Sequence, residues 1–308
     1  MFLFEKEQKI VEIASISLGG QPGEYPTVLI GSLFYQGHKI VQDFKKGIFD
    51  KAAAETLLNQ QDDLSEKTGN PCFVDIIGET SEALINFIDF VADITDAPFL
   101  IDSTRAEIRL PATRHAIKIG LGDRAIYNSL EYSSGDDELK QLREIGLKNA
   151  ILLAYNPTNV RETGPLEIVK GTSTRPGLLQ KSLEAQVENI LVDAAVLDVP
   201  SIGLSAKAIN IIKSQLGLPC GCGPSNAIAT WKKLRTTFSY DAYTACAAAS
   251  GAVPITMGGD FILYGPMAFA ERVFPVHAMI DSIIAYHARR LGIRTKNKTH
   301  PLYMVFRE

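Results

Sequence analysis

Residues 72–104 read CFVDIIGETSEALINFIDFVADITDAPFLIDST and contain the repeating unit of the fold. Two short apolar runs, CFVDIIGET and PFLIDST, flank a segment in which Leu84, Phe87 and Val91 recur at helical spacing. A short run that is apolar on both faces is typical of a parallel strand covered by helices. The stretch therefore predicts a strand, an amphipathic helix and a second strand parallel to the first.

The same rhythm extends over the chain of 308 residues. Eight apolar runs alternate with helical segments, at 26–35, 72–80, 98–104, 124–130, 149–157, 189–197, 219–226 and 254–267. Eight such units match a (β/α)8 TIM barrel. An open doubly wound sheet is the alternative, but its G-x-G-x-x-G fingerprint is missing.

No linker divides the chain, so residues 1–308 are predicted to form a single barrel domain. At its start, FLFEKEQKI followed by VEIASISLGG alternates in polarity and ends in Gly-Gly. This pattern predicts that residues 1–20 form a short N-terminal β-hairpin attached to the barrel.

Composition excludes several classes of protein. The formal net charge is −4, which is no electrostatic footprint for gripping a nucleic acid duplex. No run approaches the ~20 apolar residues of a membrane span, and the start of the sequence has no signal-peptide pattern. We therefore expect a cytoplasmic protein with no direct membrane insertion.

Cysteine and histidine usage argues against a metal centre. Cys220-Gly-Cys222 is a C-x-C pair, but tetrahedral zinc would need further ligands, and the five histidines are scattered. The alternative is two small side chains that fill a buried strand end. We expect no protein-bound metal.

Polar residues end or interrupt most of the apolar runs. A carboxylate or carboxamide there is costly to desolvate without a partner, and the C-terminal ends of barrel strands are where TIM barrels bind their ligands. Each could instead cap the following helix, and this interpretation is strongest for Asn156, which precedes a proline. Taken together they predict a ring of hydrogen-bonding groups, formed by Asp75, Asp102, Asn128, Asn156, Asp193, Asn226 and Asp260.

This set contains no evident nucleophile. The sequence has no phosphate-binding loop, no G-x-S-x-G elbow and no H-E-x-x-H. Asp and Asn side chains suit a polar heteroaromatic ligand rich in N–H and C=O groups. A phosphate-binding barrel enzyme is a further alternative, because Gly258-Gly259 is expected at the end of the eighth strand, although a tight turn would also need glycine.

Several motifs resemble a known family. GGQPGEYPTVLIGSLFYQGHKIV (19–41), KTGNPCFVDIIGET (67–80), PFLIDST (98–104) and GCGPSNAIATW (221–231) look like the H-subunit family of tetrahydromethanopterin S-methyltransferase, which includes free-standing bacterial relatives that use tetrahydrofolate. More distantly, the pattern is similar to pterin-binding methyltransferases and dihydropteroate synthase, which are (β/α)8 barrels. The resemblance implies methyl transfer between N5 of a reduced pterin and the cobalt of a corrinoid, either methylcobalamin or a corrinoid protein.

The resemblance also implies roles for individual residues. Asp102, Asn128 and Asp193 match the positions that bind the pterin ring, and Asp75 is expected to line the same pocket. Asn226 matches an Asn that contacts N5 and is the expected catalytic residue. The match departs from the distant relatives in GCGPSN around Asn226 and in VDAA around Asp193.

The identity of the pterin and the assembly are left open by the residues. The 21% charged fraction is modest, which favours a bacterial enzyme using tetrahydrofolate over a tetrahydromethanopterin-specific component of a membrane-associated complex. A non-catalytic protein that only binds a corrinoid protein is an alternative of another class. The family resemblance alone also implies a homodimer.

Overall fold

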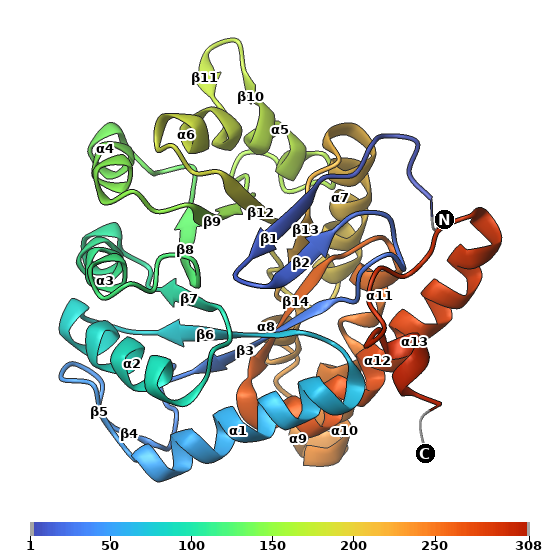
Figure 1. Cartoon of the computed structure of the whole chain (residues 1–308), viewed down its shortest axis with the longest axis horizontal. Coiled ribbons are helices and arrows are strands. Elements are labelled where there is room, and N and C mark those ends of the chain that lie inside the picture. The colour runs from blue at the N-terminus through green and yellow to red at the C-terminus, as the bar shows by residue number, and fades with distance from the viewer. Residues whose placement is uncertain (1–2, 307–308) are drawn as a thin grey trace.

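The computed structural model describes residues 3–306 and shows a closed parallel barrel surrounded by helices (Figure 1). The barrel strands follow one another around the barrel in chain order, so each helical connection leads to the neighbouring strand. The predicted (β/α)8 barrel is confirmed. Its strands are β3 (Val28–Leu33), β6 (Cys72–Ile77), β7 (Phe99–Asp102), β8 (Ala125–Leu130), β9 (Asn149–Leu153), β12 (Asn189–Asp193), β13 (Cys220–Cys222) and β14 (Phe261–Pro266).

The helices cover the outside of the barrel. Their apolar sides pack on the outward-facing strand residues and form the larger core, as the amphipathic pattern of 81–94 predicts. The helices are α1 (Lys51–Thr68), α2 (Ser81–Ile94), α3 (Ala106–Lys118), α4 (Asp136–Ile145), α5 (Gly164–Lys170), α6 (Leu178–Glu184), α7 (Ser201–Leu216), α8 (Pro224–Ile228), α9 (Leu234–Thr237), α10 (Tyr240–Ala249), α11 (Ala252–Thr256), α12 (Ala270–Ala288) and α13 (Pro301–Met304).

The N-terminal hairpin closes one end of the barrel. Strands β1 (Ile10–Ile13) and β2 (Ile16–Gly19) pair antiparallel, and their buried Ile13 and Leu18 join the apolar cluster that fills the barrel interior (Figure 1). The hairpin is therefore confirmed, but FLFEKEQKI is not its first strand, because both strands lie within 10–19. Residues 1–2 of that prediction lie outside the described part.

The observed elements differ from the sequence interpretation in three respects. The run 254–267 is not one strand, because α11 and a glycine turn precede β14. The helical segment expected between the runs 219–226 and 254–267 is interrupted, since α8 and α9 are separated by residues 229–233. The loops between barrel elements also contain two small hairpins, β4 (Val41–Asp43) with β5 (Ile48–Phe49) and β10 (Gly171–Thr172) with β11 (Arg175–Pro176).

No helix among residues 3–306 combines the length and the apolar character that crossing a bilayer requires.

Candidate active site

The alternation of side chains between the two faces of each barrel strand explains where the site residues lie. Because side chains two apart on a strand share a face, each residue two positions beyond an interior core residue also points into the barrel. Phe73, Leu100, Ile126 and Leu191 belong to the interior cluster. The polar residues Asp75, Asp102, Asn128 and Asp193 follow them at that spacing. They therefore form the layer directly above the apolar filling, at the C-terminal ends of the strands.

Strand register brings members of this layer side by side. Ser32 of β3 is the register partner of Asp75, and Asp102 is the partner of Asn128. Leu153 of β9 occupies the next position around the barrel and Asp193 follows it. Polar groups are thus concentrated on the β3–β8 half of the layer, whereas the opposite half contributes Leu153, Leu263 and the carboxyl of Asp193.

One pocket of about 780 Å³ lies above this layer. All five residues predicted to bind the ligand line it, namely Asp75, Asp102, Asn128, Asp193 and Asn226. Its size is within the range of small-molecule sites, about 300–1,000 Å³. The pocket therefore brings together side chains from five different elements, namely β6, β7, β8, β12 and α8.

Asn226 reaches the pocket in a different way from the other four residues. Strand β13 ends at Cys222, so Asn226 stands on α8 and not at the end of a strand. Its side chain is exposed, whereas Asp75 is buried. Asn226 thus lies at the entrance of the pocket and Asp75 at its floor.

Two members of the predicted ring lie elsewhere. Asn156 is buried in its own loop, where its Oδ1 accepts hydrogen bonds from the backbone N–H groups of Thr158 (3.0 Å) and Asn159 (3.1 Å). Asn156 serves this loop and does not line the pocket. Its role is therefore structural, and its place in the predicted ring was wrong.

Asp260 lies at the opposite end of the barrel because it precedes β14. Its carboxylate oxygens are 2.8 and 2.7 Å from Nζ of buried Lys213, and Oδ2 accepts a hydrogen bond from the backbone N–H of Cys220. Placing Asp260 in the ring was therefore wrong. Gly258 and Gly259 also precede the strand, which removes the basis of the phosphate-site hypothesis.

The C-x-C pair is enclosed. Cys220 and Cys222 are fully buried, and burial raises the pKa of both thiols well above its usual range. Protonated thiols are poor metal ligands. Among the described residues, no cluster of three His, Cys, Asp or Glu side chains is suited to hold a metal ion.

Burial makes the pocket carboxyls weak acids. Desolvation raises the pKa of Asp75 from 3.8 to about 6, opposed by a hydrogen bond that Ser32 Oγ donates to Oδ2 (2.7 Å). Burial also raises the pKa of Asp193 to about 6, although its Oδ1 accepts from the Ala195 N–H (2.8 Å). Burial and the adjacent Asp75 raise the pKa of Asp102 well above its usual range.

Asp75 also has an unused acceptor. Its Oδ1 is buried and no donor among the described residues lies within hydrogen-bond distance of it, although Asp102 and Asn128 also interact with this carboxyl. An unsatisfied buried acceptor is costly, so the pocket floor is arranged to accept an N–H donor from a ligand.

Ser32 and Arg109 are among the pocket residues that sequence reasoning missed. Ser32 follows Ile30 at the same two-residue spacing as the four ring residues, and that spacing could have identified it. Arg109 lines the pocket from α3 and is 2% exposed. Its position, three and seven residues before the buried Ala112 and Ala116, marks it as a charge on the inward face of that helix.

The Asp75→Asn variant is expected to be more stable than the wild type at neutral pH. A carboxyl with a raised pKa favours folding when protonated, so its contribution is present below the unfolded pKa and is lost as pH rises through about 6. Asparagine removes this loss and should raise the free energy of unfolding by about 2 kcal/mol at pH 7. Urea unfolding of the ligand-free protein between pH 4 and pH 8 measures the difference, with the exposed Asp96→Asn variant as control. Parallel pH curves for wild type and Asp75→Asn would contradict the prediction.

Comparison with known structures supports the fold. The chain is similar to Yersinia pestis dihydropteroate synthase with a pterine-sulfa conjugate (TM-score 0.61, 12% identity, 92% of this chain and 100% of that chain). It is also similar to Xanthomonas albilineans dihydropteroate synthase in complex with 7,8-dihydropteroate (TM-score 0.57, 14% identity, 90% and 98%). At these identities the likeness shows the barrel fold alone.

Sequence comparison reaches further. The family model described as tetrahydromethanopterin S-methyltransferase MtrH subunit matches residues 6–296. Proteins named as this H-subunit of tetrahydromethanopterin S-methyltransferase are 39% identical in Methanopyrus kandleri (97% of this chain, 98% of the relative) and 40% identical in Methanothermobacter thermautotrophicus (99% and 100%). The match covers nearly the whole of both chains, and the chain therefore belongs to the tetrahydromethanopterin S-methyltransferase MtrH subunit family.

Proposed function

We propose that this protein transfers a methyl group between N5 of tetrahydrofolate and a corrinoid, carried by a partner protein or free as methylcobalamin. The observation that carries the proposal is the unpartnered Asp75 Oδ1, which lies in one pocket with Asp102, Asn128, Asp193 and Asn226. Family membership supports methyl transfer as the reaction.

The donor and acceptor groups of the pocket suit the pyrimidine edge of a reduced pterin. That edge offers N–H groups beside a carbonyl, and carboxylates accept the former while a carboxamide can donate to the latter. Asp75, Asp102 and Asn128 lie together on the polar half of the pocket. We therefore assign pyrimidine recognition to these three residues, with Asp193 accepting a further N–H across the pocket.

Asn226 lies next to the position expected for N5, the reacting nitrogen. A pterin held by its pyrimidine edge at the pocket floor directs the other ring towards the entrance, where Asn226 is exposed. N5 changes its charge during methyl transfer, and a neutral carboxamide can hydrogen-bond it in either state. In this arrangement Asn226 orients N5, and a water beside it carries the proton.

The pocket entrance fits a large apolar partner group. Its neighbourhood exposes Tyr155 (39%) and Leu197 (55%), which line the pocket, and Trp231 (45%), which follows α8. Exposed apolar side chains around a polar pocket mark an interaction site. A corrinoid supplies a cobalt that can accept or release the methyl group, and these side chains would hold its ring over the entrance.

Two observations bear on the identity of the pterin. The modest charged fraction of 21% favours tetrahydrofolate. The relatives' names favour tetrahydromethanopterin, which is the second candidate. The two cofactors share the pterin head group, so the pocket floor is compatible with both.

An anaerobic assay tests the proposed function. The purified chain is mixed with methylcobalamin and either pterin, and loss of the methylcobalamin spectrum is recorded, while calorimetry gives the affinity of each pterin. We expect turnover with tetrahydrofolate and tighter binding of it than of tetrahydromethanopterin. The reverse preference would establish the second candidate. Pterin binding without transfer, even with corrinoid protein present, would favour a non-catalytic binding role.

A homodimer in the cytoplasm is also proposed. On α12, Met279, Ile283 and Tyr286 are 54%, 59% and 62% exposed at successive helical turns, which leaves an apolar stripe without a cover among the described residues. All four cysteines are free, as is usual in a reducing compartment. Sedimentation of the purified protein at the mass of one chain would contradict the dimer.

A further inference from the structure

We propose that Arg109 is a positioning residue for the pterin site: its guanidinium joins the ends of β7 and β8 and supplies the positive charge that faces the carboxyls of the pocket. The inference rests on the proposed function, because it explains how the pyrimidine-binding residues are held in place.

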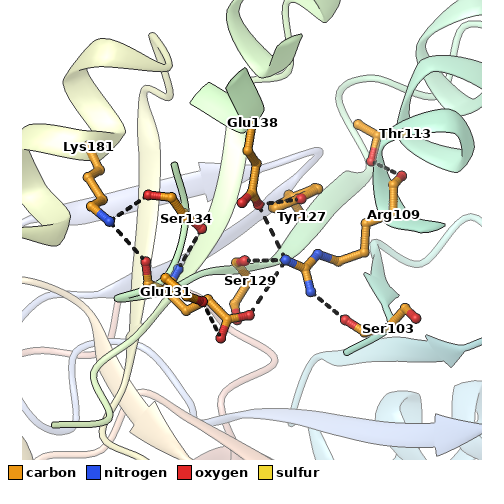
Figure 2. A network of polar contacts seen from close by, with 10 residues as sticks. Ser103, Arg109, Thr113, Tyr127, Ser129, Glu131, Ser134, Glu138 and Lys181 are labelled. Carbon is orange, nitrogen blue, oxygen red and sulfur yellow. Dashed lines mark hydrogen bonds and ion pairs between the residues drawn. The ribbon is translucent and has the colours of Figure 1, made fainter. Parts of the chain in front are cut away.

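The contacts of Arg109 converge on the two strand ends. Nη1 donates to the backbone carbonyl of Ser103, the residue directly after Asp102, and Nη2 donates to the carbonyl of Ser129, directly after Asn128 (3.1 Å). Figure 2 shows the guanidinium between these two carbonyls. One rigid, planar group thus fixes the spacing of two backbone segments that carry ligand-binding side chains.

The guanidinium is itself held from the other side. Glu138 Oε1 on α4 accepts from Nη2 (3.3 Å) and from the hydroxyl of Tyr127 (2.6 Å), and the Tyr127 ring lies 4.8 Å from the guanidinium carbon. Glu131 Oε1 is 3.6 Å from Nη2. These contacts leave the buried side chain little freedom to move away from the strand ends (Figure 2).

The loop that carries Glu131 is held in place by hydrogen bonds of its own. Lys181 on α6 donates to the backbone carbonyls of Tyr132 (2.7 Å) and Ser134 (2.6 Å). The network therefore extends from the end of β7 to α6 (Figure 2), and its members Ser103, Arg109, Ser129 and Glu131 line the pocket. Such a connected set of hydrogen bonds keeps a site within the narrow tolerance that binding geometry requires.

Arg109 also stands out by its charge. Among the described residues, it is the one Arg, Lys or His that lines the pocket, whereas Asp75, Asp102, Asp193 and Glu131 line it with acidic groups. Burial, Asp75 and Asp193 raise the pKa of Asp102, and the positive charge of Arg109 opposes them. The charged and polar groups that act on Arg109 itself are Tyr127, Glu138 and Glu131. Arg109 thus favours the carboxylate form of Asp102 that accepts an N–H.

Three variants separate charge from geometry. Pterin affinity is measured by calorimetry from pH 5 to pH 8.5 on the full chain. Arg109→Gln removes the charge and should move the pH at which affinity is half lost upward by about one unit. Arg109→Lys keeps the charge and should keep the wild-type midpoint, but its affinity should fall about tenfold because an ammonium cannot span both carbonyls. Glu138→Gln removes an opposing negative charge and should move the midpoint downward.

Arg124 provides the matched control. It donates to the backbone carbonyls of Thr95 and Ala97 and lies over the Phe99 ring, away from the pocket. Arg124→Lys is expected to lower the thermal midpoint without moving the pH profile of binding.

At saturating pterin, kcat of Arg109→Lys should stay within about threefold of the wild type, because Arg109 does not touch the reacting atoms.

The outcomes are distinct. Absence of pterin binding by the wild type would overturn the proposed function together with this inference. Normal wild-type binding, with Arg109→Lys and Glu138→Gln both keeping the wild-type affinity and midpoint, would overturn the role of Arg109 alone. Those two variants suffice for this decision if Arg109→Gln does not fold.

Discussion

Replacing Asn226 by alanine is expected to slow methyl transfer by about 10²- to 10³-fold, which is the usual effect of removing one hydrogen-bond donor aimed at a reacting atom. Affinity for the pterin should change by less than about threefold, because the pyrimidine edge keeps its partners at the pocket floor. Single-turnover kinetics with methylcobalamin gives the rate, and calorimetry gives the affinity.

The control for Asn226 is Asn156→Ala. Asn156 also follows an apolar run, yet its hydrogen bonds are spent within its own loop. That variant should lower the free energy of unfolding by about 1–3 kcal/mol and leave the rate of the folded protein unchanged. If Asn226→Ala lowers the rate of methyl transfer and the affinity for the pterin by the same factor, Asn226 does not stabilise the transition state specifically.

Replacing Asp102 by alanine is expected to weaken pterin binding by about 10²-fold or more. A carboxylate that accepts N–H bonds in a pocket shielded from water contributes on the order of 3 kcal/mol, and its loss also leaves the ligand's N–H groups unpaired. Calorimetric titration at pH 7.5 measures the loss.

The same site predicts the pH dependence of binding by the wild type. Asp75 and Asp193, each with a pKa of about 6, accept N–H bonds only when ionised. Asp102, whose pKa burial and the adjacent Asp75 raise well above the usual range, must be ionised as well. Affinity should therefore fall as the pH decreases towards and through 6. The conservative variant Asp260→Asn, at the far end of the barrel, should keep this profile although it disrupts the buried pair with Lys213.

For the Asp102→Ala variant, an affinity for the pterin equal to that of the wild type would show that Asp102 does not bind the ligand.

Stability and function make opposite demands on Asp75. A buried carboxyl with an unpartnered oxygen lowers the stability of the ligand-free protein, and the same oxygen is available to a bound donor. The Asp75→Asn variant should accordingly gain stability and lose affinity. This opposition is expected where a binding site is preorganised for a ligand.

The barrel and much of its site could be predicted from the amino-acid sequence. Eight two-sided apolar runs can be buried only as parallel strands covered by helices, and strand alternation, with its period of two, fixes Asp75, Asp102, Asn128 and Asp193 in one layer above the interior core. These features are local or periodic, so they can be read along the chain.

The other features of the site depend on contacts between distant parts of the chain. Whether a polar residue near an apolar run lies at the site depends on where the strand begins and ends. Asp260 precedes β14 and pairs with Lys213, while Asn226 reaches the pocket from α8. Arg109 acquires its place through carbonyls and carboxylates on other elements, at separations of 6 to 29 residues. Such contacts arise from closure of the barrel, and no local pattern in the sequence encodes them.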